Sequence, residues 1–440
     1  MRAVVSAVLL SSLLLPGLAF AQGKSGKSAS SEQISLFGEA LDRIRQDAVE
    51  PVADSKLIGA AIGGMLLGLD AHSAYVDEAT LTALQGGGGG DTGGIGLVVT
   101  LDHGVVKVIS PQDGSPAAAA GLKPGDLIYR IDKEPTYDLN LTQIEQKLRG
   151  PAGSEAALML RRGNAAPSEA KVERADWHLQ TVAGHIEGGN IGYLRIAGFD
   201  DGTAAALAKT VEDLRQQSQN RLIGFVIDLR NNPGGSFDAA VASADAFIDK
   251  GDIAVVKGRK AESLKRIAAT PGDIANGLPL VALVNGGTAR ESELLAGALQ
   301  DNRRAVLLGT KTYGESAIES LIPLHGNGAI RLTTARFLTP TGRQIQGKGL
   351  DPDLVVATVK LEKVETEERL HEADLRGALK NTDPLGKAPA GAPPGARATP
   401  APQGAADVAT ADIGSATDEQ LTQAVDVLRG LALVTARATR

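Results

Sequence analysis

The spacing of apolar residues divides the chain into segments with different periods. In residues 34–85 apolar side chains recur three and four positions apart, which predicts amphipathic helices, the second of them at Lys56–Leu69. Residues 92–175 alternate short apolar runs with glycine-containing turns, which is typical of a small β-rich module. Within this module we expect one helix, at Leu141–Leu148.

Residues 185–357 have a third pattern, in which buried strands alternate with amphipathic helices. This alternation predicts an α/β layer architecture. The strand candidates are Ile191–Ile196, Leu222–Leu229, Leu280–Asn285, Ala305–Gly309 and 328–339. The predicted helices between them are Thr203–Gln217, Ser236–Ile248 and Glu291–Gln300.

The first 21 residues have the features of a secretory signal peptide. Arg2 precedes a short apolar run, and small residues at Ala19 and Ala21 match a signal-peptidase site. An uncleaved membrane anchor is the alternative, but the run is short for a bilayer span. We therefore expect cleavage near Ala21-Gln22, a periplasmic or secreted protein, and no membrane span after signal removal.

The remaining segments are defined by composition. Residues 22–33 are rich in glycine, lysine and serine, which predicts a flexible leader, and the glycine run at 86–90 predicts a hinge. Towards the C-terminus we expect a charged helix at 358–380 and an Ala/Pro/Gly-rich linker at 381–416. A tail helix at 417–440 has the pattern of an isolated amphipathic helix.

Composition excludes several classes of chemistry. The chain has no cysteine, so a thiol nucleophile, a thiolate metal site and disulfides are excluded. A formal net charge of −7 gives no support for nucleic-acid binding. No metal-ligand spacing is recognisable, and His72 and His178 lack a matching Ser-Asp constellation, so we expect no metal, no cofactor and a structural role for both histidines.

Two motifs in the β-rich module indicate peptide binding. The turn Gly94-Ile95-Gly96-Leu97 opens a strand, and successive backbone N–H groups in such a turn can bind a terminal carboxylate. The run A-G-L-x-x-G-D at Ala120–Asp126 follows. Together these motifs resemble a PDZ domain, which implies binding of polypeptide C-termini or unfolded tails.

The α/β segment contains an ordered series of further motifs. They are Asp228–Gly235, Val284–Leu294, Gly309–Glu315, Leu332–Arg343 and Ile345–Asp353. With Leu69–Tyr75, where the family has proline in place of Ala71, this succession resembles the carboxyl-terminal processing proteases, also called tail-specific proteases. The likeness covers roughly residues 34–357. It implies an α/β, crotonase-like core with an inserted PDZ domain and a helical N-terminal region.

The same resemblance implies a serine/lysine dyad, in which an unprotonated lysine activates a serine. Alignment on Gly287 and Glu293 places the family's serine at Arg290, and alignment on Thr312–Gly314 places its lysine at Glu315. The family's assisting glutamine falls on Glu319.

Arginine offers no nucleophile at neutral pH, and the glutamate has no hydroxyl to activate. We expect Arg290 to pair with Glu315 or Glu319 in the former active site. The backbone N–H groups of Gly234, Gly235 and Glu291 are the expected oxyanion-hole-like donors.

The leading hypothesis is an exported homologue that binds C-terminal tails without proteolysis, as a scaffold or regulator, with an active protease or adaptor as a further partner. The alternative is an active serine-type endopeptidase with a relocated dyad formed by Lys311 with Ser292 or Ser316. A third possibility is a PDZ interaction module whose α/β core is only structural.

Overall fold

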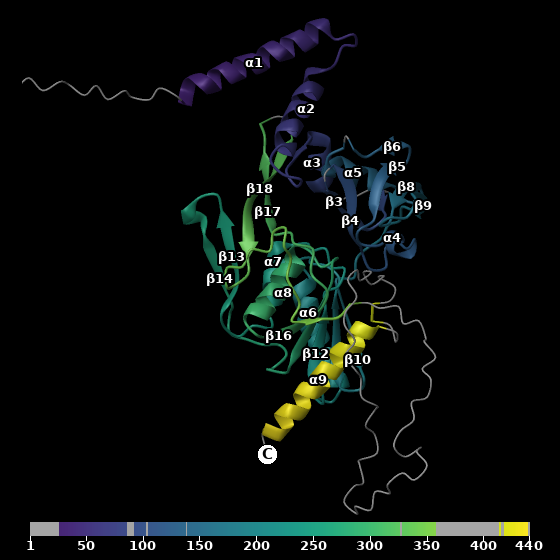
Figure 1. Cartoon of the computed structure of the whole chain (residues 1–440), viewed down its shortest axis with the longest axis vertical. Helices are drawn as coiled ribbons and strands as arrows, with labels where there is room; N and C mark the ends of the chain where they lie inside the picture. The colour runs from purple at the N-terminus through teal and green to yellow at the C-terminus, as the bar shows by residue number, and fades with distance from the viewer. Residues whose placement is uncertain are drawn as a thin grey trace, which may run out of the picture. The chain divides into compact units, whose positions relative to one another are not determined.

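The computed structural model describes residues 26–85, 92–102, 104–137, 139–325, 328–357, 413–414 and 418–438. The chain divides into two compact units, residues 1–62 and 63–440. Elements of both are labelled in Figure 1. The predicted signal peptide, the glycine hinge, the charged helix and most of the linker lie outside the described residues.

The first unit contains helix α1 (Gly26–Asp47) and most of helix α2 (Asp54–Leu67). The guanidinium of Arg45 donates to both carboxylate oxygens of Asp54, at 2.8 and 2.7 Å, and so joins the two helices. Because α1 begins at Gly26, residues 26–33 are helical, although the sequence predicted a flexible leader there. This stretch contains no proline and continues directly into the amphipathic pattern, so the helix propagates backwards into it.

The β-rich module of the second unit forms a sheet with the strand order β3-β4-β5-β8-β9. Its strands are β3 (Leu97–Asp102), β4 (Val105–Pro111), β5 (Leu127–Ile131), β8 (Glu155–Arg161) and β9 (Ser168–Glu173), with β6 (Glu134–Pro135) paired to β5. The module also contains α4 (Pro116–Ala119) and α5 (Leu141–Leu148), and the short strands β2 (Thr92–Gly94) and β7 (Arg149–Pro151) pair with each other. In this sheet β3 is an edge strand.

The core of the second unit is a sheet with the order β10-β11-β12-β15-β16-β19. Its strands are β10 (Val182–Glu187), β11 (Ile191–Ile196), β12 (Gly224–Asp228), β15 (Leu280–Val284), β16 (Ala305–Gly309) and β19 (Leu354–Val355). In this sheet β11, β12, β15, β16 and β19 pair in parallel, and β10 is antiparallel to β11. Continuous apolar sequences predicted β11, β12, β15 and β16, because a parallel sheet is covered on both faces, whereas β10 and β19 had not been predicted.

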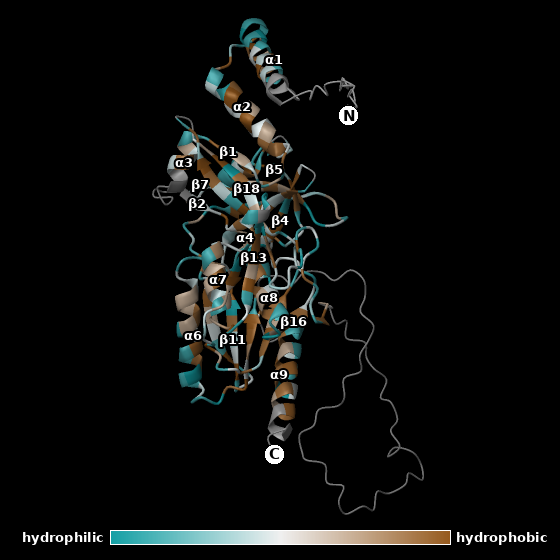
Figure 2. Ribbon diagram, turned by 90° about the vertical axis from the view of Figure 1, so that its left-hand side faces the viewer, coloured by the Kyte–Doolittle hydropathy of each residue, from teal (hydrophilic) through white to brown (hydrophobic). Residues whose placement is uncertain are grey.

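Helices α6 (Thr203–Gln217), α7 (Phe237–Asp245) and α8 (Glu291–Asp301) share one hydrophobic core with the sheet. Helix α9 (Glu419–Ala438) packs on the other face, where Leu428 joins Val226 and Val281 in a second cluster. Figure 2 shows α6 and α9 on opposite sides of the core strands. The tail helix is therefore not isolated: its apolar stripe covers a sheet face that would otherwise meet water.

The N-terminal start of α9 also contacts the core through buried charged side chains. Arg230, directly after β12, is fully buried and donates to Asp228 at 3.0 Å, to Asp418 at 2.9 Å and to Gln420 at 3.0 Å. Asp418 also accepts the N–H of Leu421, so it caps the helix at the same time. The helix start and the loop after β12 therefore form one hydrogen-bonded unit.

A second sheet of the core carries strands that the sequence analysis mostly missed. It has the order β1-β18-β13-β14, with β17 paired to β18. The strands are β1 (Ala74–Val76), β13 (Asp252–Gly258), β14 (Lys265–Ala268), β17 (Ala317–Pro323) and β18 (Ala329–Leu338). Only β18 had been predicted. Strands β14 and β17 expose much of their surface, β1 has only three residues, and the apolar run of β13 had not been recognised. Helix α3 (Glu78–Gln85) and a 3₁₀ turn at Ala261–Ser263 complete the described elements.

Candidate functional site

The loop after β12 presents two glycines beside the start of α8. Gly234 donates its N–H to Asn232 Oδ1 at 2.9 Å, and Gly235 donates its N–H to Glu291 Oε2 at 3.0 Å. Gly235 has no room for a side chain, since a Cβ there would lie 2.2 Å from the carbonyl oxygen of Phe199. Both glycine N–H groups, expected as free anion donors, already have side-chain oxygen partners.

Glu291 is the residue that fills the expected oxyanion position. Its carboxylate accepts the N–H of Gly235. Burial raises the pKa of Glu291, against the opposing effects of Arg290 and of nearby backbone N–H groups. A carboxylate oxygen therefore occupies the place where donors of this kind would hold the oxygen of a tetrahedral intermediate. Only the backbone N–H of Glu291 had been predicted to take part in the site. An acidic side chain next to an anion-binding turn could have indicated this contact from the sequence.

Arg290 is the N-cap residue of α8 and has φ 55° and ψ −121°. Such a backbone conformation is rare for a residue with a side chain and costs about 1–3 kcal/mol. It is held by Glu293, which accepts the N–H of Arg290 at 3.2 Å. The backbone thus keeps a strained turn at the position where the resemblance places a nucleophile.

Glu293 also fixes the loop that carries Glu315. Its side chain is fully buried and accepts the N–H groups of Gly314 and Glu315, each at 2.8 Å, and the hydroxyl of Thr312. Burial raises the pKa of Glu293 to about 7, although these hydrogen bonds act in the opposite direction. Sequence analysis used Glu293 only to set the alignment, yet a glutamate at the third residue of a helix is a known signature of such capping.

The arginine and the glutamates lie together. Arg290 Nε is 3.5 Å from Glu315 Oε1, and Arg290 Nη2 is 3.9 Å from Glu319 Oε1. Burial alone would lower the pKa of Arg290, but the surrounding carboxylates of Glu291, Glu315 and Glu319 raise it. The expected ion pairing is present, and a partly exposed arginine and a buried glutamate lie where the resemblance places a serine and a lysine.

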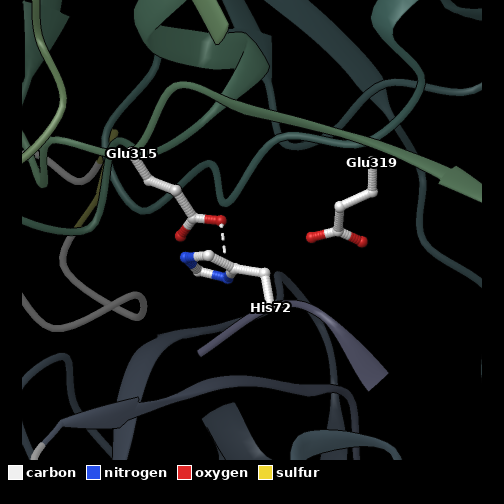
Figure 3. Close-up of side chains that lie close together, drawn as sticks. All are labelled: His72, Glu315 and Glu319. Atoms are coloured by element: carbon white, nitrogen blue, oxygen red, sulfur yellow. Dashed lines mark ion pairs between the residues drawn. The ribbon is translucent and has the colours of Figure 1, made fainter. Parts of the chain in front are cut away.

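His72 joins this cluster from a distant part of the chain. Its Nδ1 lies 3.4 Å from Glu315 Oε1, and Figure 3 shows the His72 ring beside the Glu315 carboxylate. The ligand atoms of His72, Glu315 and Glu319 all lie within 4.8 Å of one another. Sequence reasoning assigned His72 a structural role and found no metal spacing, because these residues are far apart in sequence.

The weaker catalytic candidates have other partners. The Ser292 hydroxyl lies 2.7 Å from the carbonyl oxygen of Asn232 and 2.6 Å from that of Ala289. The exposed Lys311 forms an ion pair with Asp351 at 2.9 Å, and Ser316 contacts Gln346. Neither serine thus has Lys311 as its partner.

The predicted peptide-binding turn lies at the start of edge strand β3. Gly96 has φ +65°, and a Cβ there would lie 2.3 Å from Cβ of Ser115 and 3.1 Å from the Trp177 ring. A cavity of about 570 Å³ extends from this turn between β3 and α5. Its lining includes Ile95, Leu97, Leu148, Arg149, Trp177 and Arg331.

None of the helices among the described ranges is both long enough and apolar enough to cross a lipid bilayer.

Comparisons with known proteins agree with the two motif series. Residues 190–356 match the model of peptidase family S41, and residues 107–162 match a PDZ domain. The chain is 40% identical over 352 residues to a carboxy-terminal-processing protease of Bartonella bacilliformis, covering 79% of this chain and 81% of the relative. It is 28% identical over 354 residues to the carboxy-terminal processing protease CtpA of Bacillus subtilis, covering 80% and 75%.

A solved structure, the photosystem II D1 C-terminal processing protease, superposes with a TM-score of 0.64 at 29% identity. The match covers 74% of this chain and 93% of that structure. The predicted α/β peptidase core with a PDZ domain and an N-terminal helical region is confirmed.

Proposed function

Because this chain belongs to the carboxyl-terminal processing proteases of peptidase family S41, we propose that it is an exported member that binds polypeptide C-termini without cutting them. It acts as a pseudopeptidase, either as a scaffold or as a regulator of an active protease or adaptor. Export rests on the predicted signal peptide of residues 1–21, with cleavage near Ala21-Gln22.

The proposed loss of proteolysis rests on the hydrogen bond that the Gly235 N–H donates to the Glu291 carboxylate. Peptide hydrolysis by a serine peptidase needs a nucleophile, a base and free donors for the developing oxyanion. Arg290 and Glu315 stand where the nucleophile and the base would be. The Glu291 carboxylate accepts the Gly235 N–H, which would otherwise be a free oxyanion donor. A substrate carbonyl entering this position would meet a carboxylate, which repels the charge of the tetrahedral intermediate.

The retained function rests on the cavity beside β3. An edge strand offers unpaired backbone groups to an extended peptide, and a turn such as Gly94–Leu97 can bind its terminal carboxylate. Apolar side chains from Ile95, Leu97 and Leu148 line the space for the last side chains of the peptide. We therefore expect tails that end in an apolar residue with a free carboxylate.

Tail binding can be measured through Trp177, the chain's one tryptophan, which lines the cavity. Peptides with an apolar C-terminal residue are titrated into the full mature chain, with the same peptides amidated at the C-terminus as control. We expect the free carboxylate to bind and the amide to bind at least about tenfold more weakly, because the carboxylate accepts charge-assisted hydrogen bonds. Equal binding of the two forms would contradict the assignment.

Gly96→Ala tests the same turn from the protein side. The positive φ and the 2.3 Å approach to Ser115 leave no room for the added methyl group, so peptide binding should be lost. Gly104→Ala is a matched control, since Gly104 also has a positive φ in the same module but a Cβ there meets nothing within 4 Å. Retained binding in Gly96→Ala with a folded domain would count against the proposal.

Proteolysis is tested on a disordered polypeptide that ends in apolar residues. We expect no cleavage by the mature chain. Cleavage that disappears in Ser292→Ala or Lys311→Ala would instead support the relocated dyad and overturn the pseudopeptidase assignment.

A further inference from the structure

We propose that His72, Glu315 and Glu319 form a binding site for a divalent first-row transition metal ion, with Zn²⁺ as the best match. The site lies at the position where the resemblance places the catalytic serine and lysine of the family. It does not depend on tail binding by the PDZ domain.

The geometry is close to that of a three-ligand zinc site. His72 Nδ1 and Glu315 Oε1 are 3.4 Å apart, which is about the separation of two ligand atoms around one tetrahedral Zn²⁺ with bonds of roughly 2.0–2.2 Å. Glu319 completes a set whose ligand atoms lie within 4.8 Å of one another. Figure 3 shows the Glu315 carboxylate beside the His72 ring and the Glu319 carboxylate on the other side of that ring.

The backbones of the three residues are held by neighbouring elements. Asp70 accepts the N–H groups of His72 and Ser73, at 2.8 and 2.7 Å, and Thr333 on β18 donates to Asp70 and to Ser73. Thr333 is also the cross-strand neighbour of Glu319. One residue of β18 therefore connects the turn that carries His72 with the strand that carries Glu319.

An observation that is independent of the ligand geometry indicates that Glu315 lacks a binding partner. Its side chain is 3% exposed, and its Oε2 has no hydrogen-bond partner. A buried carboxylate oxygen without a partner costs about 1–3 kcal/mol or more, so such atoms are rare in folded proteins. A cation bound by both carboxylate oxygens of Glu315 would give Oε2 a partner and remove this cost.

Arg290 is the cation that competes for the same carboxylates. Its distances of 3.5 Å to Glu315 and 3.9 Å to Glu319 are those of loose ion pairs, and its own Nε has no hydrogen-bond partner. Its side chain is 30% exposed, which leaves it a path towards solvent. Three glutamates, Glu291, Glu315 and Glu319, share this arginine, so a divalent cation would improve the local charge balance.

The ligand types select the class of metal. One imidazole nitrogen and two carboxylates suit Zn²⁺, Mn²⁺ or Fe²⁺, whereas Ca²⁺ and Mg²⁺ prefer sites made only of oxygen. With three protein ligands, a four-coordinate Zn²⁺ keeps one position for water or a polypeptide oxygen.

The test is Zn²⁺ binding to the full mature chain, freed of metal by chelation and carrying no affinity tag. Calorimetry or competition with a chromophoric chelator should give one Zn²⁺ per chain, with Mg²⁺ at least about a hundredfold weaker. Zn²⁺ should also raise the melting temperature, because it binds only the folded site.

Three variants decide where the ion binds. Glu315→Gln and His72→Ala should each weaken binding by at least about tenfold, since each removes a ligand. Arg290→Gln should tighten it, because the competing charge is gone. His185→Ala is the matched control and should change nothing, because His185 forms a half-exposed pair with Glu187 elsewhere on the core.

Circular dichroism verifies that each variant is folded. The proposal is overturned if the wild-type chain binds no stoichiometric Zn²⁺, if His72→Ala and Glu315→Gln bind as well as wild type, or if Arg290→Gln weakens binding.

Discussion

The Glu291 carboxylate lies 3.0 Å from the backbone nitrogen of Gly235 and accepts its hydrogen. This contact joins the start of α8 to the loop after β12, the two elements from which we expect the oxyanion donors of an active relative. An acidic side chain in this position supplies internally the negative oxygen that a substrate would supply in the transition state. The proposed inactivity therefore has more than one cause, and we expect that restoring a nucleophile alone would not be sufficient.

Restoration of activity provides the first prediction. The double variant Arg290→Ser, Glu315→Lys regains a serine and a base but leaves Glu291 on the anion donors, so we expect little turnover. Adding Glu291→Ala frees the Gly235 N–H, and since one such donor contributes about 10²–10³ in kcat, the triple variant should exceed the double by about a hundredfold.

The measurement is cleavage of a disordered polypeptide, with labelling by a serine-directed phosphonate as a second readout. Addition of Glu319→Gln, the family's residue, should raise the triple variant further. Equal rates for the double and triple variants would show that Glu291 does not obstruct the site.

Stability should depend strongly on the buried contact of Asp418 with Arg230. Asp418→Ala removes one partner of a fully buried guanidinium and the cap of α9, so we expect a loss of about 3–5 kcal/mol in the free energy of unfolding. Urea unfolding followed by circular dichroism measures it.

Asp426→Ala is the control on the same helix. Asp426 pairs with Arg429 at 3.6 Å with its side chain 68% exposed, so its removal should change stability by less than about 0.5 kcal/mol. Similar losses in the two variants would mean that the buried contact adds nothing beyond helix propensity.

The raised pKa of Glu293 predicts that the free energy of unfolding depends on pH. Its pKa of about 7 in the folded chain is above the ordinary value of 4.5, so the folded state holds a proton that the unfolded state releases. The resulting stabilisation is complete below pH 4.5 and is lost as the pH rises through about 7. Glu293→Gln, which cannot titrate, should therefore gain stability relative to wild type between pH 5 and 8.

The expected slope of this difference is up to about 1 kcal/mol per pH unit, on top of a constant penalty for lost hydrogen bonds. Parallel urea titrations across this range measure it, and Glu39→Gln on α1, an exposed position, is the control. A difference between Glu293→Gln and wild type that does not vary with pH would refute a raised pKa.

Much of the architecture could be predicted from local patterns in the chain. Helices Leu141–Leu148 and Thr203–Gln217 have the predicted bounds, because their apolar spacing is a local signal. The strand Ile191–Ile196 was also correct, since a continuously apolar segment of that length belongs inside a parallel sheet. The substitutions at Arg290 and Glu315 were visible from motif alignment, which needs no coordinates.

Only the tertiary structure decided what the side chains at the site contact. Glu291 was identified for its backbone, but the direction of its carboxylate depends on how the Gly234-Gly235 turn packs against α8. His72 reaches Glu315 because β1 pairs with β18, a contact between distant segments with no signal in local spacing. The tail helix was expected to be isolated, yet it packs on the core sheet, because the apolar face that it covers belongs to strands far away in sequence. Local patterns determine which helices and strands form, whereas long-range packing determines which side chains come into contact. Nearly all contacts in this site join residues that are far apart in the sequence.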